Sequence, residues 1–323
     1  MGHRILLLAV AGIILIAGGF FSLYGENENK SPSPSEVALE QLNKCADTFY
    51  TQEKAKVTRI SCFVQAPEIF KAQEYRSRYI LEKVDYEMIW EQDKSLTVKP
   101  RDIPPYFGWE AKGEAEVYAK VMAAQLQEFL KFTDPVSEVI KQVKTLQKTE
   151  CYDITSAPDG KLQKIELNIK DAEKARRRHR KTDRSKEEDS LKEEKLPDNI
   201  TVWLNADYQI TRLESLDYKE KIVGVLTPVK YSKMWNVGQL DITTYKVTRT
   251  EKEDSGETVP PPSLAFKERT KMAFTYANPI EKVMAILNLQ ITRLDKDGKT
   301  LVRRNEPNPV NITFTKHEVE KSK

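Results

Sequence analysis

Segments in which apolar and polar residues alternate recur along most of this chain, and they constrain its fold more than any other feature. In the segment Lys161 to Lys170, Ile165, Leu167 and Ile169 alternate with polar residues. Successive side chains of a β-strand point to opposite faces of a sheet, so this period of two predicts strands with one apolar face. Similar patterns predict strands over residues 56–65, 74–83, 85–92, 95–99, 199–205, 209–219, 222–226, 240–250, 264–276, 283–294, 300–304 and 310–319.

Two segments have helical periodicity instead. The first begins at Ser33-Pro34-Ser35-Glu36, which combines a capping box with a proline at the first helical position, and it is expected to reach Glu53. The second covers residues 114–148 and carries an apolar stripe on one face. Asp134-Pro135 breaks and restarts this segment, with Asp134 as the N-cap. Such stripes are usually core, so we expect these helices to pack on the sheet.

The N-terminal residues 5–24 form an uncharged apolar run, long enough to cross the hydrocarbon core of a bilayer as a helix. Arg4 precedes the run, while Glu26 follows it, so the positive-inside rule places the N-terminus in the cytoplasm and the body outside. A cleaved signal peptide is the alternative, although no convincing small-residue cleavage site follows the run. We expect a transmembrane anchor or signal over residues 1–25 and a solvated linker over residues 26–33.

A strongly charged segment, residues 171–196, separates two predicted strands. Its basic run from Arg176 to Lys181 suggests nucleic acid or anionic lipid, but acidic residues directly downstream balance it. The whole chain has 52 basic and 49 acidic side chains, a formal net charge of +3, which gives no electrostatic case for nucleic-acid binding. We therefore expect a solvated hairpin insertion and no nucleic-acid partner.

The pentapeptide QITRL occurs twice, at Gln209 to Leu213 and at Gln290 to Leu294. The first copy opens a predicted strand just after a turn, whereas the second closes a predicted strand just before one. A duplicated module should preserve the position of the pentapeptide relative to its turns. We therefore interpret the repeat as two strands of similar composition, with a duplicated module as the alternative.

The common sequence signatures of enzymes and metal sites are absent. The three histidines, His3, His179 and His317, are far apart in the sequence, and HExxH, GxSxG, GxGxxG and GxxxxGK[ST] do not occur. Carboxylate pairs carry no specificity in a chain with 49 acidic residues. The sequence thus predicts no catalytic residue, no metal and no cofactor, and an enzyme is not expected.

Two features depend on the compartment. Outside the cytoplasm, two of Cys45, Cys62 and Cys151 could form a disulfide, with Cys45 and Cys62 as plausible partners, or all three could be buried thiols. Asn199 and Asn311 each begin an N-x-T triplet, which would be a glycosylation site if the chain were a eukaryotic type II membrane glycoprotein.

Three stretches together resemble the periplasmic lipoprotein carriers of the LolA/LolB-like family, over roughly residues 35–235. One is the helix that runs into a strand, EVALEQLNKCADTFYTQEKAKVTRISCFV. Another is the aromatic strand pair YRSRYILEKVDYEMIW. The third is GKLQKIELNIK followed, after the charged insertion, by NITVWLNADYQITRLESLDYKEK. The resemblance implies a curved sheet that forms an open half-barrel, helices that close its mouth, and an apolar cavity for acyl chains.

On this basis we expect an α+β fold, in which a curved antiparallel sheet is covered by helices. A domain over residues 34–235 is expected to be followed by a β-rich extension over residues 236–323, which has no counterpart in the carriers. The candidate cavity residues are Tyr79, Leu81, Tyr86, Met88, Trp90, Trp203 and Leu213.

The leading functional hypothesis is a single-pass protein of the inner membrane, with its body in the periplasm, that binds an apolar or lipidic ligand or the acyl chains of a lipoprotein. A retained anchor would prevent shuttling between membranes, but it leaves lipid binding open. The alternative is a structural or adaptor protein with a filled core that binds other envelope proteins.

Overall fold

The computed structural model describes residues 33–66, 84–92, 94–103, 105–106, 108–130, 133–137, 139–140, 143, 152–170, 197–217, 219–231, 233–248, 262–278, 283–302 and 308–322. Among these residues, no helix combines the length and the apolar character needed to cross a membrane. The predicted anchor over residues 1–25, the linker up to residue 32 and the charged insertion lie outside the described residues.

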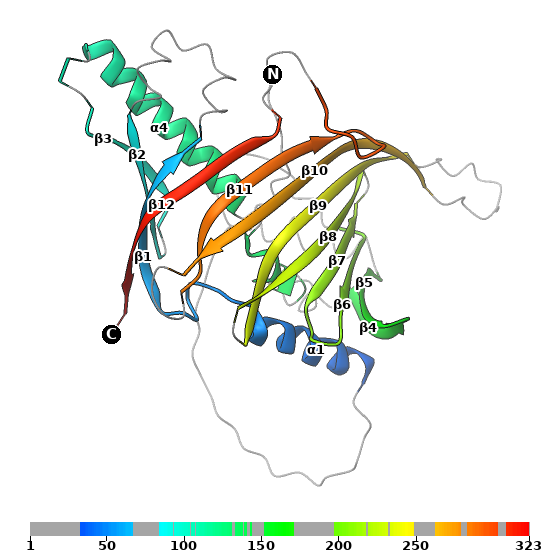
Figure 1. The fold of residues 1–323 in the computed structure, drawn as a ribbon. Coiled ribbons are helices and arrows are strands. Elements are labelled where there is room, and N and C mark those ends of the chain that lie inside the picture. Colours follow the sequence, from blue (N-terminus) through cyan, green and yellow to red (C-terminus); the bar gives the residue numbers. More distant parts are fainter. Residues whose placement is uncertain are drawn as a thin grey trace, which may run out of the picture.

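The described strands form one open antiparallel sheet with 12 members, which curves strongly (Figure 1). The strands are β1 (Val57–Gln65), β2 (Asp85–Glu91), β3 (Thr97–Arg101), β4 (Tyr152–Asp159), β5 (Leu162–Ile169), β6 (Asn199–Leu204), β7 (Ile210–Leu216), β8 (Glu220–Tyr231), β9 (Met234–Thr248), β10 (Ser263–Ala277), β11 (Ala285–Leu294) and β12 (Val310–Lys321). Their order is β3-β2-β1-β12-β11-β10-β9-β8-β7-β6-β5-β4. The antiparallel sheet predicted from the alternating segments is therefore confirmed.

The strand order places the last strand beside the first one. β1 pairs with β12 on one side and with β2 on the other, and β4 to β12 form one continuous meander. β9 runs across residue 235, where the sequence predicted a domain to end, and it pairs with both neighbours in the same sheet. Residues before and after that boundary thus share one sheet.

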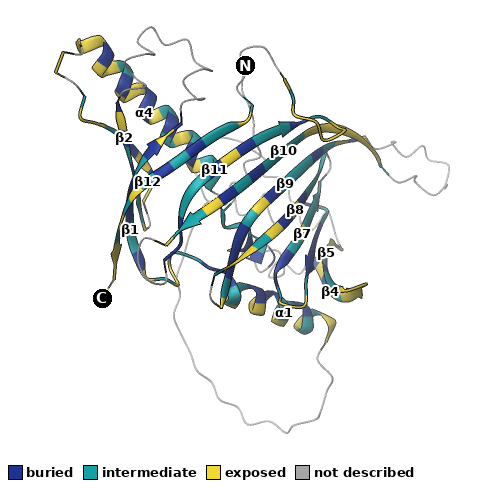
Figure 2. Ribbon diagram, in the orientation of Figure 1, coloured by how far each residue is buried: buried dark blue, intermediate teal, exposed yellow. Residues whose placement is uncertain are grey.

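The edge strands of the sheet are β3 and β4, and each of them contacts a helix. α4 (Trp109–Leu130) packs against β3, and α1 (Pro34–Thr48) packs against β4. Each edge strand of the open sheet thus has a helix packed against it. One apolar core includes residues from both helices and from the sheet face beneath them. The alternation of buried and exposed residues along the strands is visible in Figure 2.

The predicted capping box starts α1. The Ser33 side chain accepts from the Glu36 backbone N–H, and the Ser33 N–H donates to Glu36 Oε2 at 2.7 Å. The helix ends at Thr48 rather than at the predicted Glu53. Its C-cap, Phe49, is extended, and the Tyr50 N–H donates to the carbonyl of Trp235 in β9 at 2.9 Å. A tertiary hydrogen bond to the sheet therefore replaces the next turn of helix.

The predicted second helical segment, residues 114–148, is described up to Leu130 and in parts from residue 133 to residue 143. α4 begins at Trp109, earlier than predicted, and buries Tyr118, Met122 and Leu126 from the expected stripe. After Leu130 the chain is helical again at residues 135–137. Asp134 Oδ1 accepts from the Ser137 backbone N–H at 3.0 Å, so the predicted N-cap is confirmed.

Several described strands are longer or shifted at their ends, as in β9, which begins at Met234 rather than at Leu240, and the structure departs from the predicted strands in kind at two places. β4 was not predicted, because its sequence YDITSAPD mixes small and polar residues, but it forms a hairpin with β5 through Gly160, whose φ is +61°. The predicted strand over residues 300–304 is not regular over its described part. Asn308 Nδ2 donates to the carbonyls of Arg293 and Leu301 at 2.8 and 2.7 Å. The Asn308 side chain thus supplies hydrogen-bond donors that a neighbouring strand would otherwise provide.

The charged insertion leaves and rejoins the sheet between two paired strands. β5 pairs with β6 in antiparallel register, and the Ile169 N–H donates to the carbonyl of Asp198 at 3.0 Å. The described residues that flank the insertion are therefore adjacent, as a hairpin insertion requires. The two QITRL copies begin β7 at Ile210 and end β11 at Leu294, separated in the sheet by β8, β9 and β10.

Candidate functional site

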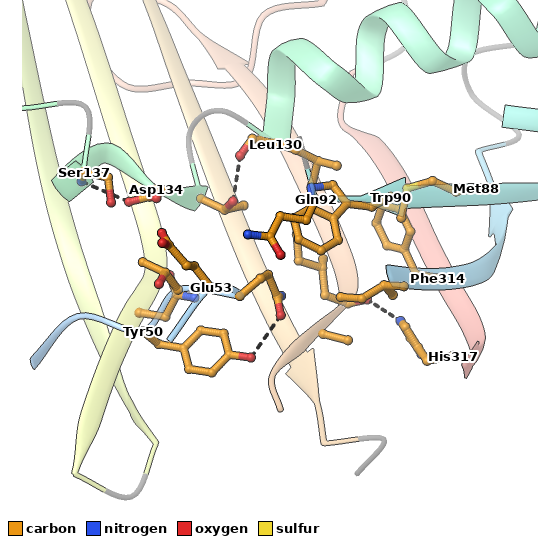
Figure 3. Close-up of a pocket in the computed structure, with 17 residues that line it drawn as sticks. Tyr50, Glu53, Met88, Trp90, Gln92, Leu130, Asp134, Ser137, Phe314 and His317 are labelled. Atoms are coloured by element: carbon orange, nitrogen blue, oxygen red, sulfur yellow. Dashed lines mark hydrogen bonds between the residues drawn. The ribbon is translucent and has the colours of Figure 1, made fainter. Parts of the chain in front are cut away.

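A cavity of about 510 Å³ lies between the core-facing side of the sheet and the segments that follow α1 and α4. Its apolar wall comes from β1, β2, β11, β12 and the end of α4, and its polar residues come mostly from residues 50–53 and 133–137 (Figure 3). The apolar residues are Ile60, Met88, Trp90, Leu130, Ala285, Ile286 and Phe314. Strands from the N-terminal and C-terminal parts of the chain, which the β1–β12 pairing brings together, thus build a single wall.

Strand register explains how β1 and β2 supply this wall. Ile60 lies opposite Trp90, and Cys62 lies opposite Met88, so their side chains share one face of the sheet. Met88 is buried, and Trp90 is partly exposed where it borders the cavity. The alternation predicted over residues 85–92 therefore puts two of the seven candidate residues on the cavity wall.

An irregularity in β12 places His317 in the same wall. Ile312 and Phe314 are buried on the core side, and strict alternation would bring Lys316 to that side next. Between Ser61 and Phe63 the register on β12 shifts by one extra residue, and Lys316 has a φ of 52°. This bulge turns Lys316 outward, 4.8 Å from the centre of the Phe63 ring, and brings His317 to the cavity.

His317 and the segment after α1 are tied to the start of β11. His317 Nε2 lies 2.8 Å from the Ile286 carbonyl, so this nitrogen carries the proton. Tyr50 Oη accepts from the Met284 backbone N–H at 2.9 Å and lies 3.1 Å from Gln52 Oε1, to which it donates. Gln52 Nε2 in turn donates to the Met284 carbonyl at 3.0 Å. Burial raises the pKa of the Tyr50 hydroxyl to about 12, so it stays neutral near pH 7.

Two carboxylates line the other end of the cavity. Glu53 is exposed, whereas Asp134 is partly buried and is held by its N-cap hydrogen bond to Ser137. Burial raises the pKa of the Asp134 carboxyl, and Ser137 and the nearby Lys54 lower it to a smaller extent. Lys54 itself does not line the cavity, because its ammonium donates to the carbonyls of Ala46 and Phe49 at the end of α1.

The remaining candidate residues lie elsewhere. Tyr86 is buried between β2 and α4, with its ring 5.2 Å from that of Tyr118. Leu213 lies opposite Val202 on the core face, but it does not line the cavity. Tyr79 and Leu81 lie outside the described residues.

Trp203 lies on the opposite face of the sheet from the cavity, since its neighbours Val202 and Leu204 both belong to the core. Its ring lies beneath the cationic groups of Arg212 and Lys164, at 5.0 and 5.8 Å from the ring centre. Its indole N–H donates to Asp159 Oδ2 at 2.9 Å. Charged neighbours thus surround the ring of this buried tryptophan and contribute cation–π contacts.

A second hollow, a groove of about 760 Å³, lies between β3 and α4. Val98, Ile103, Ala119 and Ala123 supply its apolar lining. The groove follows the contact between the edge strand β3 and the helix α4.

The two described cysteines, Cys45 and Cys62, are buried free thiols, and Cys151 lies outside the described residues. Burial raises the pKa of each thiol to about 12, so both remain protonated near pH 7. We expect iodoacetamide at pH 8 to leave both residues unlabelled in the native protein and to label both in urea, as read by peptide mass mapping. Rapid labelling of either residue under native conditions would contradict the burial described here.

The geometry offers an apolar wall, neutral hydrogen-bonding groups and two carboxylates, which together suit an amphiphilic small molecule. Within the described residues, no three or more side chains of the metal-binding types come together as a metal site would require. Neither families of known proteins, nor curated proteins, nor solved structures yield a match to this chain, so the site is interpreted from its own residues.

Proposed function

We propose that this protein binds an apolar or lipidic ligand in the cavity between its sheet and its helices. In this proposal the curved sheet acts as an open half-barrel, in the manner of the LolA/LolB-like carriers that the sequence resembles. The observation that carries it is the cavity wall of Met88, Trp90 and Phe314, which lies on the core side of the sheet beside polar groups. A cavity of about 510 Å³ is within the range of about 300–1,000 Å³ typical of small-molecule sites.

The physical basis is the burial of apolar surface. Each Å² of alkyl surface removed from water contributes about 25 cal/mol, so the alkyl chain of a ligand needs contact area more than specific polar partners. Polar groups at one end would then orient the ligand, because an unpaired head group is costly to bury. The apolar run over residues 5–24 would hold this binding body at the outer face of the inner membrane.

A second candidate function is supported by the other face of the sheet. Val225, Leu264 and Phe266, on β8 and β10, are large apolar side chains with exposed fractions of 49%, 45% and 37%. β9 lies between these two strands in the sheet, and exposed apolar side chains on one face of a sheet are typical of protein-binding surfaces. This patch favours an adaptor that contacts other envelope proteins, with or without a ligand in the cavity.

The test is native mass spectrometry of a chain that begins at residue 26. Every described helix, strand and core residue lies between Ser33 and Ser322, so this chain retains the cavity, and a cooperative urea transition verifies its folding. We expect a co-purifying mass that organic extraction identifies as a lipid or another alkyl compound, or uptake of an added alkyl ligand. A clean apo mass together with no uptake would reject the proposal in favour of the adaptor.

A further inference from the structure

We propose that the ligand of this cavity carries a cationic amine head group, and that carboxylates and phosphates are disfavoured. This inference rests on the proposed function and specifies its ligand class. It comes from the sign and position of the charges that line the cavity, which differ from those expected at a site for a fatty acid or a phospholipid phosphate.

The charged side chains among the described lining residues are acidic. Glu53 and Asp134 lie at the polar end of the cavity, and the described lining contains no lysine or arginine. Figure 3 draws both carboxylates on one side of the site, away from Met88, Trp90 and Phe314 on the other. An amphiphile with its chain against the apolar wall would therefore bring its head group toward the carboxylates.

Several other polar side chains of the described lining are neutral amides or hydroxyls. They include Gln52, Gln92, Asn236 and Ser137, which can hydrogen-bond to a head group but cannot compensate an anion. The Tyr50 hydroxyl is neutral near pH 7, and His317 uses Nε2 to bind the Ile286 carbonyl. A carboxylate or phosphate head near Glu53 and Asp134 would thus meet two like charges without a lysine or arginine on the described lining to offset them.

Neither carboxylate has an ion-pair partner within the described part of the chain. Lys54 interacts electrostatically with both Asp134 and Glu53, but its ammonium is held by the carbonyls at the end of α1. Asp134 is partly buried, and burial raises its pKa because a charged carboxylate loses hydration there. An ammonium head group would compensate this loss, since it supplies three N–H donors and the opposite charge.

The experiment compares ligands that share a twelve-carbon chain and differ in the head group. Dodecylamine, dodecanol and dodecanoate are titrated into the chain from residue 26 by calorimetry, at pH 7.5 and below their aggregation concentrations. We expect dodecylamine to bind about tenfold or more tighter than dodecanoate, the effect of one charge-assisted hydrogen bond. Dodecanoyl lysophosphatidylethanolamine, which adds a phosphate beside its ammonium, should bind more weakly than dodecylamine.

Asp134→Asn is the decisive variant, because asparagine can still cap the following helix while the charge is removed. We expect this variant to weaken dodecylamine binding about tenfold and to change dodecanol binding less than about twofold. The matched control is Asp207→Asn, which removes an exposed carboxylate that pairs with Lys230 at 2.9 Å outside the cavity. This control should leave all affinities unchanged.

The outcomes separate this inference from the function on which it rests. Dodecanoate or the lysophospholipid binding as tightly as dodecylamine would overturn the head-group assignment and leave ligand binding intact. Unchanged dodecylamine affinity in Asp134→Asn would overturn it in the same way. Failure of every ligand to bind a folded chain would reject both proposals.

Discussion

Replacing Trp235 by alanine is expected to lower the free energy of unfolding by about 3–5 kcal/mol, the largest single-residue effect that we predict for this fold. Trp235 is 1% exposed in β9, and its ring lies 4.9 Å from that of Phe49 in an edge-to-face contact. Its indole N–H donates to Thr48 Oγ1 at 3.2 Å. Truncation would therefore leave a cavity and remove the side-chain contacts with Phe49 and Thr48, while the backbone hydrogen bond from Tyr50 to residue 235 remains. Urea denaturation followed by circular dichroism measures the change.

The matched control is Trp109→Ala, because Trp109 begins α4 with 82% of its side chain exposed. This substitution should change the free energy of unfolding by less than about 0.5 kcal/mol. An equal loss in the two variants would mean that tryptophan itself, rather than the contact between α1 and β9, determines the effect. A loss below about 1 kcal/mol in Trp235→Ala would contradict the packing described for the core.

Replacing Trp90 by glutamate is expected to reduce the affinity for dodecanol or dodecylamine more than tenfold. Trp90 borders the cavity opposite Ile60, and it is only partly buried, so the substitution should be tolerated by the fold. A carboxylate at this position would have to lose its hydration to contact an alkyl chain. Calorimetric titration, with the urea midpoint measured on the same sample, separates lost binding from lost stability.

Trp109→Glu provides the same chemical change at an exposed position outside the cavity. Its affinity should equal that of the wild-type chain. If Trp90→Glu binds alkyl ligands as well as this control does, the apolar wall is not where the chain of the ligand lies. Binding would then have to be sought at the groove between β3 and α4 or on the exposed face of β8 and β10.

The local pattern of this chain predicts most of its strands but not how they are ordered. Alternation in β5, for example, requires only that one face be buried, and this is visible within ten residues. The pairing of β1 with β12 joins Ile60 to Val319 across most of the sequence, and no local pattern encodes it. β4 was missed for a different reason, since its small and polar residues gain their strand conformation from the hairpin with β5.

The candidate site was predictable to a similar degree. Met88 and Trp90 follow from alternation, whereas Trp203 also fits a strand but occupies the opposite face, which its own segment cannot reveal. His317 was missed, although the sequence holds a signal for it. Apolar residues occupy even positions at Ile312 and Phe314 and an odd position at Val319, and this change of parity marks the bulge.

The pairing of β1 with β12 also has a consequence for the order of events during synthesis. A ribosome makes β1 roughly 250 residues before β12, and until β12 arrives that side of β1 has no partner strand. Phe314 and His317 come with β12, so a nascent or C-terminally clipped chain would have an incomplete cavity wall. In the proposed function, ligand binding would then require β12, and a protease that removed this strand would release the ligand.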